Sequence, residues 1–233
     1  MIRSSVVSVF VLAAVWTGAT HASLEHTDPS IAARVSALMD QMTLEERAAQ
    51  LAAPFGSAAI SLNNFNATGF GAVSLTSLSI HSPTELVQQR NALQKQYMDS
   101  GRLSIPLSFT QEVLHGGAAG ATVFPMPLTM GTTWDEALVE EVYASIASDL
   151  SAVGGDLGYA PVINLFMDPR FGRHQEGFST NPMLSARYAT AAVKGLQGDN
   201  GGSNTGYMNT DRVVALGKHV AGYGGAPGGL NAA

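Results

Sequence analysis

The sequence has no cysteine, and only 13% of its residues are charged. Without disulfide bonds, the stability of the fold has to come from a large buried core. The net charge of −6 and the scarcity of Lys and Arg leave no basic stripe that could follow a phosphate backbone, so we expect no nucleic-acid partner. Polarity comes from Ser, Thr, Asn and 25 Gly, a composition that suits a neutral, hydroxyl-rich ligand and an ordinary protein surface equally well.

Several motifs of known chemistry are also missing. The sequence contains no G-x-S-x-G elbow for a serine hydrolase, no cysteine nucleophile and no H-E-x-x-H pair for zinc. Its glycine clusters at 116–117 and 222–229 match neither G-x-G-x-x-G nor a phosphate-binding loop. We therefore expect neither a metal nor a cofactor.

The N-terminal segment has the features of a secretory signal. Arg3 precedes an apolar run from Val6 to Trp16, and small residues follow up to Ala22. The run is shorter than the ~20 residues that span a bilayer, so we predict a cleaved signal peptide at residues 1–22 and a secreted chain with no membrane attachment afterwards. Asn66 lies in an N-x-[ST] sequon and is a glycosylation candidate on a surface loop.

Apolar strands alternate with amphipathic helices along the rest of the chain. We predict helices at 35–51, 82–98, 134–153 and 181–196, with a capping box at Thr43 and Glu46 starting a second helix inside the first of these ranges. We predict strands at 69–75, 104–109, 157–165 and 212–218. This order indicates an α/β fold with a parallel sheet that is covered on both faces.

Four strands are too few for a closed (β/α)₈ barrel, which needs eight strands and ~250 residues. The sheet is therefore either open and complete, or half of a barrel. An exposed half barrel would leave sheet edges uncovered, so residues 23–233 alone should then be poorly soluble or oligomeric.

Polar clusters follow three of the predicted strands: Gln111 to Gly116, Asp168 to Arg173 with Glu176, and the Lys218-His219 pair. A single charged residue at a strand end more often ties a loop than binds a ligand. Three clusters at the carboxyl edge of one parallel sheet instead predict a shared pocket, because ligands bind at this edge.

The same segments resemble glycoside hydrolase family 3, the β-glucosidase and exo-glucanase family. The resemblance runs almost end to end after the signal, and six motifs occur in the family's order. They are 42–51 (MTLEEKVGQL in the family), 105–116 (IPxxxxxDxxHG), 121–125 (GATxFP), 168–173 (DPRWGR), 194–198 (KGLQG) and 218–224 (KHFAGYG). The resemblance implies an incomplete TIM-type (β/α)₈ barrel, with residues 23–233 forming roughly its first four βα units.

The resemblance also implies a sugar-binding site. The family's clamp on the non-reducing-end glucose corresponds here to Glu112, Arg173, Lys218 and His219. This agrees with the chemistry of a pyranose, whose neighbouring hydroxyls can donate to a carboxylate and accept from a guanidinium, an ammonium and an imidazole. Supporting roles fall to four further residues: Asp168 and Arg170 brace their loop, His115 ties its own turn, and Glu176 lies beside the clamp.

The Lys218-His219 pair poses a geometric problem, because adjacent residues of a regular strand point to opposite faces. Both can reach one sugar ring only if the backbone is irregular. We therefore predict a bulge or a cis peptide within residues 216–221.

The family hydrolyses glycosides with retention, which needs two carboxyl groups ~5–5.5 Å apart. Its nucleophilic Asp and acid/base Glu correspond to positions beyond Ala233, so we expect no catalytic residue in this chain and no turnover without the rest of the barrel and the C-terminal domain. The expected substrate is a β-glucoside or β-glucan oligosaccharide. The alternative is a secreted, non-catalytic sugar-binding homologue, which a stop codon after Ala233 would favour.

The sequence departs from the quoted family motifs at several positions. Position 112 is Glu where the motif above has Asp, and the family uses both acids. Residues 178–182 lack both acids of the usual GEDP, and Phe171 replaces a Trp. Asn181 can still cap the helix that follows.

Overall fold

The computed structural model describes residues 29–54, 69–74, 82–117, 120–199 and 208–225. The predicted signal peptide at residues 1–22 and the sequon at Asn66 lie outside these ranges, so both stay predictions. The chain forms two compact units, Met1–Met42 and Thr43–Ala233. The described part of the first unit consists mainly of helix α1 (Pro29–Met39), and the second unit carries the sheet.

The helical region predicted at 35–51 consists of two helices, and the second begins where the capping box places it. Helix α2 (Leu44–Ala49) starts after Thr43, whose Oγ1 accepts from the Glu46 amide at 3.2 Å. The Thr43 amide in turn donates to Glu46 Oε2 at 2.8 Å. Each residue thus satisfies an amide that would otherwise lack a partner at the helix start.

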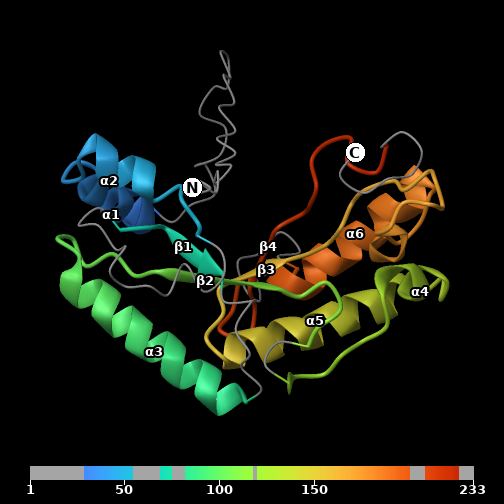
Figure 1. Ribbon diagram of the computed structural model, residues 1–233, viewed down its shortest axis with the longest axis horizontal. Helices are drawn as coiled ribbons and strands as arrows, with labels where there is room; N and C mark the ends of the chain where they lie inside the picture. The colour runs from blue at the N-terminus through green and yellow to red at the C-terminus, as the bar shows by residue number, and fades with distance from the viewer. Residues whose placement is uncertain (1–28, 55–68, 75–81, 118–119, 200–207, 226–233) are drawn as a thin grey trace, which may run out of the picture. The chain divides into compact units, whose positions relative to one another are not determined.

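The second unit contains one parallel sheet with strand order β1-β2-β3-β4 (Figure 1). The strands are β1 (Ala72–Ser74), β2 (Ser108–Glu112), β3 (Leu157–Tyr159) and β4 (Val214–Ala215). Every neighbouring pair is parallel, with Thr110 opposite both Ser74 and Leu157. Sequential strands are therefore spatial neighbours, as in the first half of a barrel, and the predicted α/β class is confirmed.

Three of the predicted helices are confirmed: α3 (Pro83–Ser100), α5 (Glu136–Ala152) and α6 (Pro182–Gln197). Helix α6 begins as expected, because Asn181 Oδ1 accepts from the amides of Met183 and Leu184. The short helices α4 (Pro127–Gly131) and η4 (His174–Glu176) were not predicted. Within the described residues, no helix has the length and hydropathy needed to cross a bilayer.

The strand boundaries were predicted less well than the helices. Strand β2 begins at Ser108 rather than Ser104, and β3 and β4 occupy only short parts of the ranges 157–165 and 212–218. The prolines explain part of this difference, since Pro106 and Pro161 have no amide hydrogen to offer a sheet partner. The irregular backbone after β3 and β4 carries the polar clusters.

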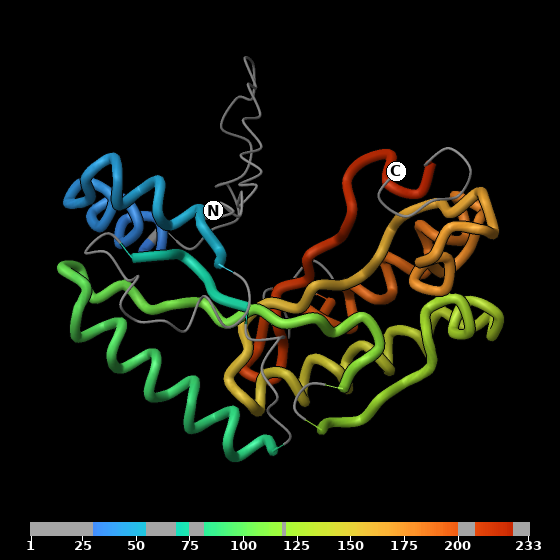
Figure 2. Tube along the Cα trace, in the orientation of Figure 1, coloured from blue at the N-terminus to red at the C-terminus, as the bar shows by residue number. Residues whose placement is uncertain are grey.

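The core lies between the sheet and helices α3, α5 and α6. Val73 and Phe109 from the strands and Tyr143 and Ala192 from the helices belong to one buried cluster. Helices α5 and α6 run side by side (Figures 1 and 2), and their backbones approach closely at Gly195, where a Cβ would lie 2.4 Å from the Glu140 carbonyl oxygen. Packing of this density provides stability without disulfides.

Candidate functional site

The predicted site residues lie where β2, β3 and β4 end. Glu112 is the last residue of β2 and pairs in register with Tyr159, the last residue of β3. Beyond β4 the ladder resumes at Lys218, whose amide donates to the Pro161 carbonyl at 3.0 Å and whose carbonyl accepts from Ile163 at 2.7 Å. These backbone bonds fix Lys218 beside the chain that leaves β3.

Glu112 and Lys218 form an ion pair, although 106 positions separate them in the sequence. The Lys218 side chain is only 12% exposed, while that of Glu112 is 45% exposed. The ammonium also lies 5.9 Å from the centre of the Tyr159 ring. The pair therefore presents one acceptor and one donor at the carboxyl edge of the sheet.

Arg173 forms a bidentate salt bridge with Glu176. Its Nε donates to Glu176 Oε1 at 2.7 Å, and its Nη2 donates to Oε2 at 2.6 Å. The remaining nitrogen, Nη1, donates to the Tyr223 hydroxyl at 3.2 Å. The pKa of Arg173 is raised, mainly by the hydrogen bonds that its guanidinium donates to Glu176, so the guanidinium stays charged.

His219 contacts two residues that flank it in space. Its ring nitrogen Nδ1 lies 2.9 Å from Asn164 Oδ1, and its ring packs edge-on against the ring of Tyr223, with 4.6 Å between the ring centroids. Burial lowers the pKa of His219, and the nearby charges of Arg173 and Lys218 lower it further. The imidazole is therefore mainly neutral at neutral pH.

The peptide between Lys218 and His219 is cis, and so is the peptide between Val220 and Ala221. The prediction of an irregular backbone within residues 216–221 is confirmed.

The residues with predicted supporting roles make contacts that fit those roles. Arg170 forms hydrogen bonds to Asp168 through its side chain and its amide, and these bonds hold the pKa of Asp168 at about 2. His115 Nδ1 lies 3.2 Å from the Phe124 carbonyl oxygen, and the Phe124 amide donates to the His115 carbonyl at 2.8 Å. These contacts close the loops around the site without reaching the centre of the cluster.

The structure thus links the predicted clamp residues in two pairs. Lys218 of one pair and His219 of the other are neighbours in the sequence. Glu112 contacts Lys218, and Arg173 reaches His219 through Tyr223. Sequence reasoning gave no role to Tyr223 or Asn164. Tyr223 lies within the 218–224 motif, and Asn164 is a polar residue in an apolar strand-like run, so both left a signal that could have been followed.

Two hollows adjoin these residues. One of about 380 Å³ is lined by Asn164, His219 and Tyr223, among others. Another of about 510 Å³ is lined by residues that include Asp168 and Arg170. Both lie on the loops that follow β3 and β4, where three of the four clamp residues are.

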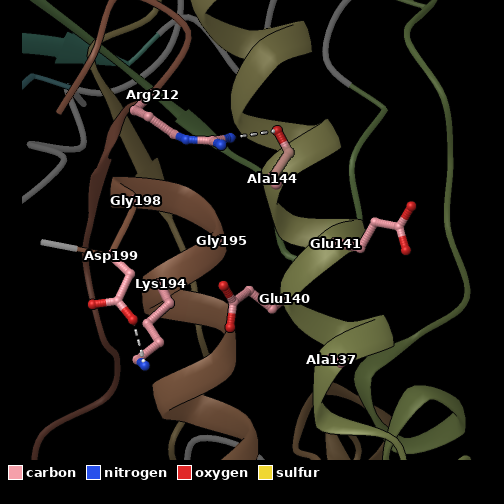
Figure 3. Close-up of a pocket in the computed structure, with 9 residues that line it drawn as sticks. All are labelled: Ala137, Glu140, Glu141, Ala144, Lys194, Gly195, Gly198, Asp199 and Arg212. Carbon is pink, nitrogen blue, oxygen red and sulfur yellow. Dashed lines mark hydrogen bonds and ion pairs between the residues drawn. The ribbon is translucent and has the colours of Figure 1, made fainter. Parts of the chain in front are cut away.

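A third hollow, of about 340 Å³, lies between α5 and α6 and includes none of the predicted site residues (Figure 3). Its two cationic side chains already have partners: Lys194 binds Asp199 at 2.7 Å, and Arg212 donates to the Ala144 carbonyl at 3.3 Å. We therefore place the candidate site at the strand ends.

The acidic residues near the clamp do not form a pair of free carboxyl groups. Glu112, Asp168 and Glu176 each bind a cationic side chain. With its pKa at about 2, Asp168 cannot act as a proton donor at neutral pH. In the described part of the chain, no three His, Asp or Glu side chains gather as a metal ligand set.

A parallel sheet with polar residues gathered at its carboxyl edge is the arrangement of barrel-type enzymes. The chain belongs to glycosyl hydrolase family 3, since the model of that family's N-terminal domain matches residues 43–233. The predicted family and the predicted partial TIM-type barrel are both confirmed.

Individual relatives agree with this assignment. The chain is 31% identical to a putative β-xylosidase of Formosa agariphila. The match covers 87% of this chain and 28% of the β-xylosidase. A β-glucosidase from Erythrobacter marinus superposes with a TM-score of 0.76 at 32% identity, covering 84% of this chain and 26% of that one. An exo-1,3/1,4-β-glucanase from a Pseudoalteromonas species superposes at 0.79 with 27% identity, covering 88% and 26%. The chain thus spans little more than a quarter of each of these relatives.

Proposed function

We propose that the full-length protein is secreted and hydrolyses terminal, non-reducing β-D-glucosyl residues with retention of configuration. Residues 23–233 supply the sugar-binding half of the subsite for the cleaved residue. The observation that carries this proposal is the convergence of Glu112, Lys218, Arg173 and His219 at one edge of the sheet through the contacts described above.

The side chains complement a sugar ring. The ion pair of Glu112 and Lys218 matches two neighbouring hydroxyls, one donating to the carboxylate and one accepting from the ammonium. Glu176 holds two nitrogens of Arg173, so Nη1 is oriented toward Tyr223 and is the guanidinium donor available for a third hydroxyl. Because the partners are held before the ligand arrives, little side-chain entropy is lost on binding.

The catalytic carboxyl groups lie outside this chain in our proposal. A retaining mechanism needs a nucleophile and an acid/base group ~5–5.5 Å apart, and the acids nearest the clamp are all engaged with cations. The much greater length of the relatives supports a further catalytic contribution from segments that this chain lacks.

The names of the relatives support a β-linked glucose or xylose unit as the substrate class. They include a periplasmic β-glucosidase of Salmonella typhimurium that is 32% identical to this chain. That match covers 61% of this chain and 17% of the β-glucosidase. Glucose and xylose differ by the hydroxymethyl group at C5, so the clamp on the ring hydroxyls fits both sugars. We propose glucose as the preferred unit.

The test compares p-nitrophenyl β-D-glucopyranoside and β-D-xylopyranoside as substrates of the full-length protein and of residues 23–233. We expect turnover only by the full-length protein, with the glucoside preferred and the β-anomer of glucose as the first product detected by NMR. Faster hydrolysis of the xyloside would overturn the choice of sugar. Turnover by residues 23–233 would overturn the placement of the catalytic groups.

The same preparation tests secretion and the non-catalytic alternative. A secreted protein whose N-terminal residue is Ser23 is expected, whereas retention of residues 1–22 would contradict the predicted signal cleavage. Glucose binding without turnover by the full-length protein would favour the sugar-binding homologue.

A further inference from the structure

Asn164 occupies a central position behind the clamp. It follows β3, is 6% exposed and bonds to a segment of the chain that comes more than 50 residues later. Its Nδ2 donates to the carbonyl oxygens of His219 and Tyr223. Its Oδ1 accepts from the His219 amide at 3.0 Å and lies 2.9 Å from the ring nitrogen Nδ1.

These contacts determine which way the Asn164 amide faces. The two carbonyl oxygens can only accept, so the atom facing them has to be the NH₂ group. The His219 amide can only donate, so the atom facing it has to be the oxygen. A flipped amide would place oxygen against two oxygens and NH₂ against an N–H.

The orientation of Asn164 determines the tautomer of His219. Because Oδ1 can only accept, the ring nitrogen 2.9 Å away has to carry a proton. In a neutral imidazole the other nitrogen, Nε2, then has a lone pair and no proton. Among the described residues Nε2 has no hydrogen-bond partner, and His219 lines the hollow of about 380 Å³.

We propose that Asn164 is a positioning residue for sugar recognition, which holds His219 as the Nδ1–H imidazole so that Nε2 accepts a hydrogen bond from a substrate hydroxyl. This inference rests on the proposed function. The charged groups facing His219 are Arg173 and Lys218, which favour the neutral ring, and Glu176, which opposes them. The resemblance suggested an imidazole that donates to a sugar hydroxyl, but with the proton on Nδ1 the neutral ring can only accept at Nε2. Arg173 and Lys218 then supply the donors.

The first test observes the tautomer directly in full-length protein labelled with ¹⁵N-histidine. Two-bond ¹H–¹⁵N correlations distinguish Nδ1–H from Nε2–H rings, and a His219→Gln variant assigns the signal. We expect wild-type His219 to be the neutral Nδ1–H form at neutral pH, without any ligand. An Nε2–H or doubly protonated ring would overturn the inference even if the protein hydrolyses glucosides.

The second test uses Asn164→Leu, which removes the acceptor, and Asn164→Asp, which keeps one. Asn91→Asp on the exposed face of α3 is a matched control. We expect Asn164→Leu to abolish the Nδ1–H preference and to weaken glucose binding about tenfold, the value of one good hydrogen bond. Asn164→Asp loses both donor contacts to the His219 and Tyr223 carbonyls but keeps an acceptor, so Nδ1 should stay protonated. Asn91→Asp should change neither property.

Substrate analogues separate recognition from a merely structural role. Fluorine cannot donate a hydrogen bond, so replacing the hydroxyl that faces Nε2 should weaken binding about tenfold in the wild type. The same replacement should cost nothing further in Asn164→Leu. If every ring position shows equal losses in both proteins, His219 is not the acceptor. If the wild type binds no glucose while the tautomer is as expected, the proposed function fails and the geometry of Asn164 stands.

Discussion

The contact between Arg173 and Glu176 offers the sharpest prediction about the clamp. Glu176→Gln keeps the shape of the side chain but replaces one carboxylate oxygen with an NH₂ group that cannot accept. Hydrogen bonds to charged groups contribute about 1.5–3 kcal/mol each. Because both side chains are largely buried, with 28% exposure for Arg173 and 15% for Glu176, we expect the loss of one such bond to cost about 2 kcal/mol.

The cost should be local, because the contact closes the short segment around η4. Hydrogen exchange in a peptide covering 171–180 of the full-length protein should therefore speed up by roughly 30-fold, which corresponds to about 2 kcal/mol of local opening free energy. The KM for the glucoside should rise about tenfold, because Arg173 no longer holds Nη1 in place.

Asp168→Asn is the matched control for this prediction. It makes the same chemical change in another two-pronged contact, but its partner Arg170 is 69% exposed, and exposed ion pairs contribute little. Exchange and KM should change much less in this variant. Equal effects of the two substitutions, or no effect of Glu176→Gln, would refute the reasoning from burial.

Three further predictions concern the scaffold and its response to pH. In Gly195→Ala the new methyl group would meet helix α5, so the variant should be destabilised by about 2 kcal/mol. Ala186→Gly on the exposed face of α6 measures the opposing helix-propensity effect of about 1 kcal/mol. An unchanged urea midpoint for Gly195→Ala would contradict this. Arg102 donates to Glu46 and, together with the Thr43 amide, holds the pKa of Glu46 at about 2. Arg102→Met should therefore move the NMR titration midpoint of Glu46 upward. An unmoved midpoint would show that Arg102 is not the cause of the lowered pKa. The lowered pKa of His219 means that the unfolded state binds more protons than the folded state as the pH falls through ~6.5, so stability should fall with it. His219→Gln should show a shallower fall in the same unfolding titration.

Local signals predicted the helices well. Thr43 and Glu46 satisfy each other's backbone groups within one turn, so the start of α2 is encoded in four neighbouring residues. Asn181 likewise caps α6 through amides two and three positions away. Such contacts depend on short spacing along the chain and can therefore be read from the sequence.

The strand ends were harder to predict, because their conformation depends on distant partners. Residues 160–165 are as apolar as a strand, but after Tyr159 the ladder continues only as an isolated bridge between Val162 and Lys218, and Asn164 bonds to His219 and Tyr223. No local pattern encodes these contacts. The extension of the predicted strand to Leu165 is therefore wrong.

The candidate site likewise combines residues that the sequence predicts with residues whose roles depend on distant partners. The resemblance to the family predicted Glu112, Arg173, Lys218 and His219 as the clamp, because their motif positions are visible in the sequence. The roles of Asn164 and Tyr223 depend on contacts across some 50 residues, and they became apparent only when the chain was folded. The irregular backbone at Lys218-His219 was predictable because two adjacent residues were expected to serve one ligand.

A crystal structure of the full-length protein with bound glucose would show whether the four clamp residues bind one sugar. We expect one glucose ring within hydrogen-bonding distance of Glu112, Arg173, Lys218 and His219, with a hydroxyl donating to His219 Nε2. A glucose bound elsewhere, with these four side chains contacting only one another, would contradict this expectation.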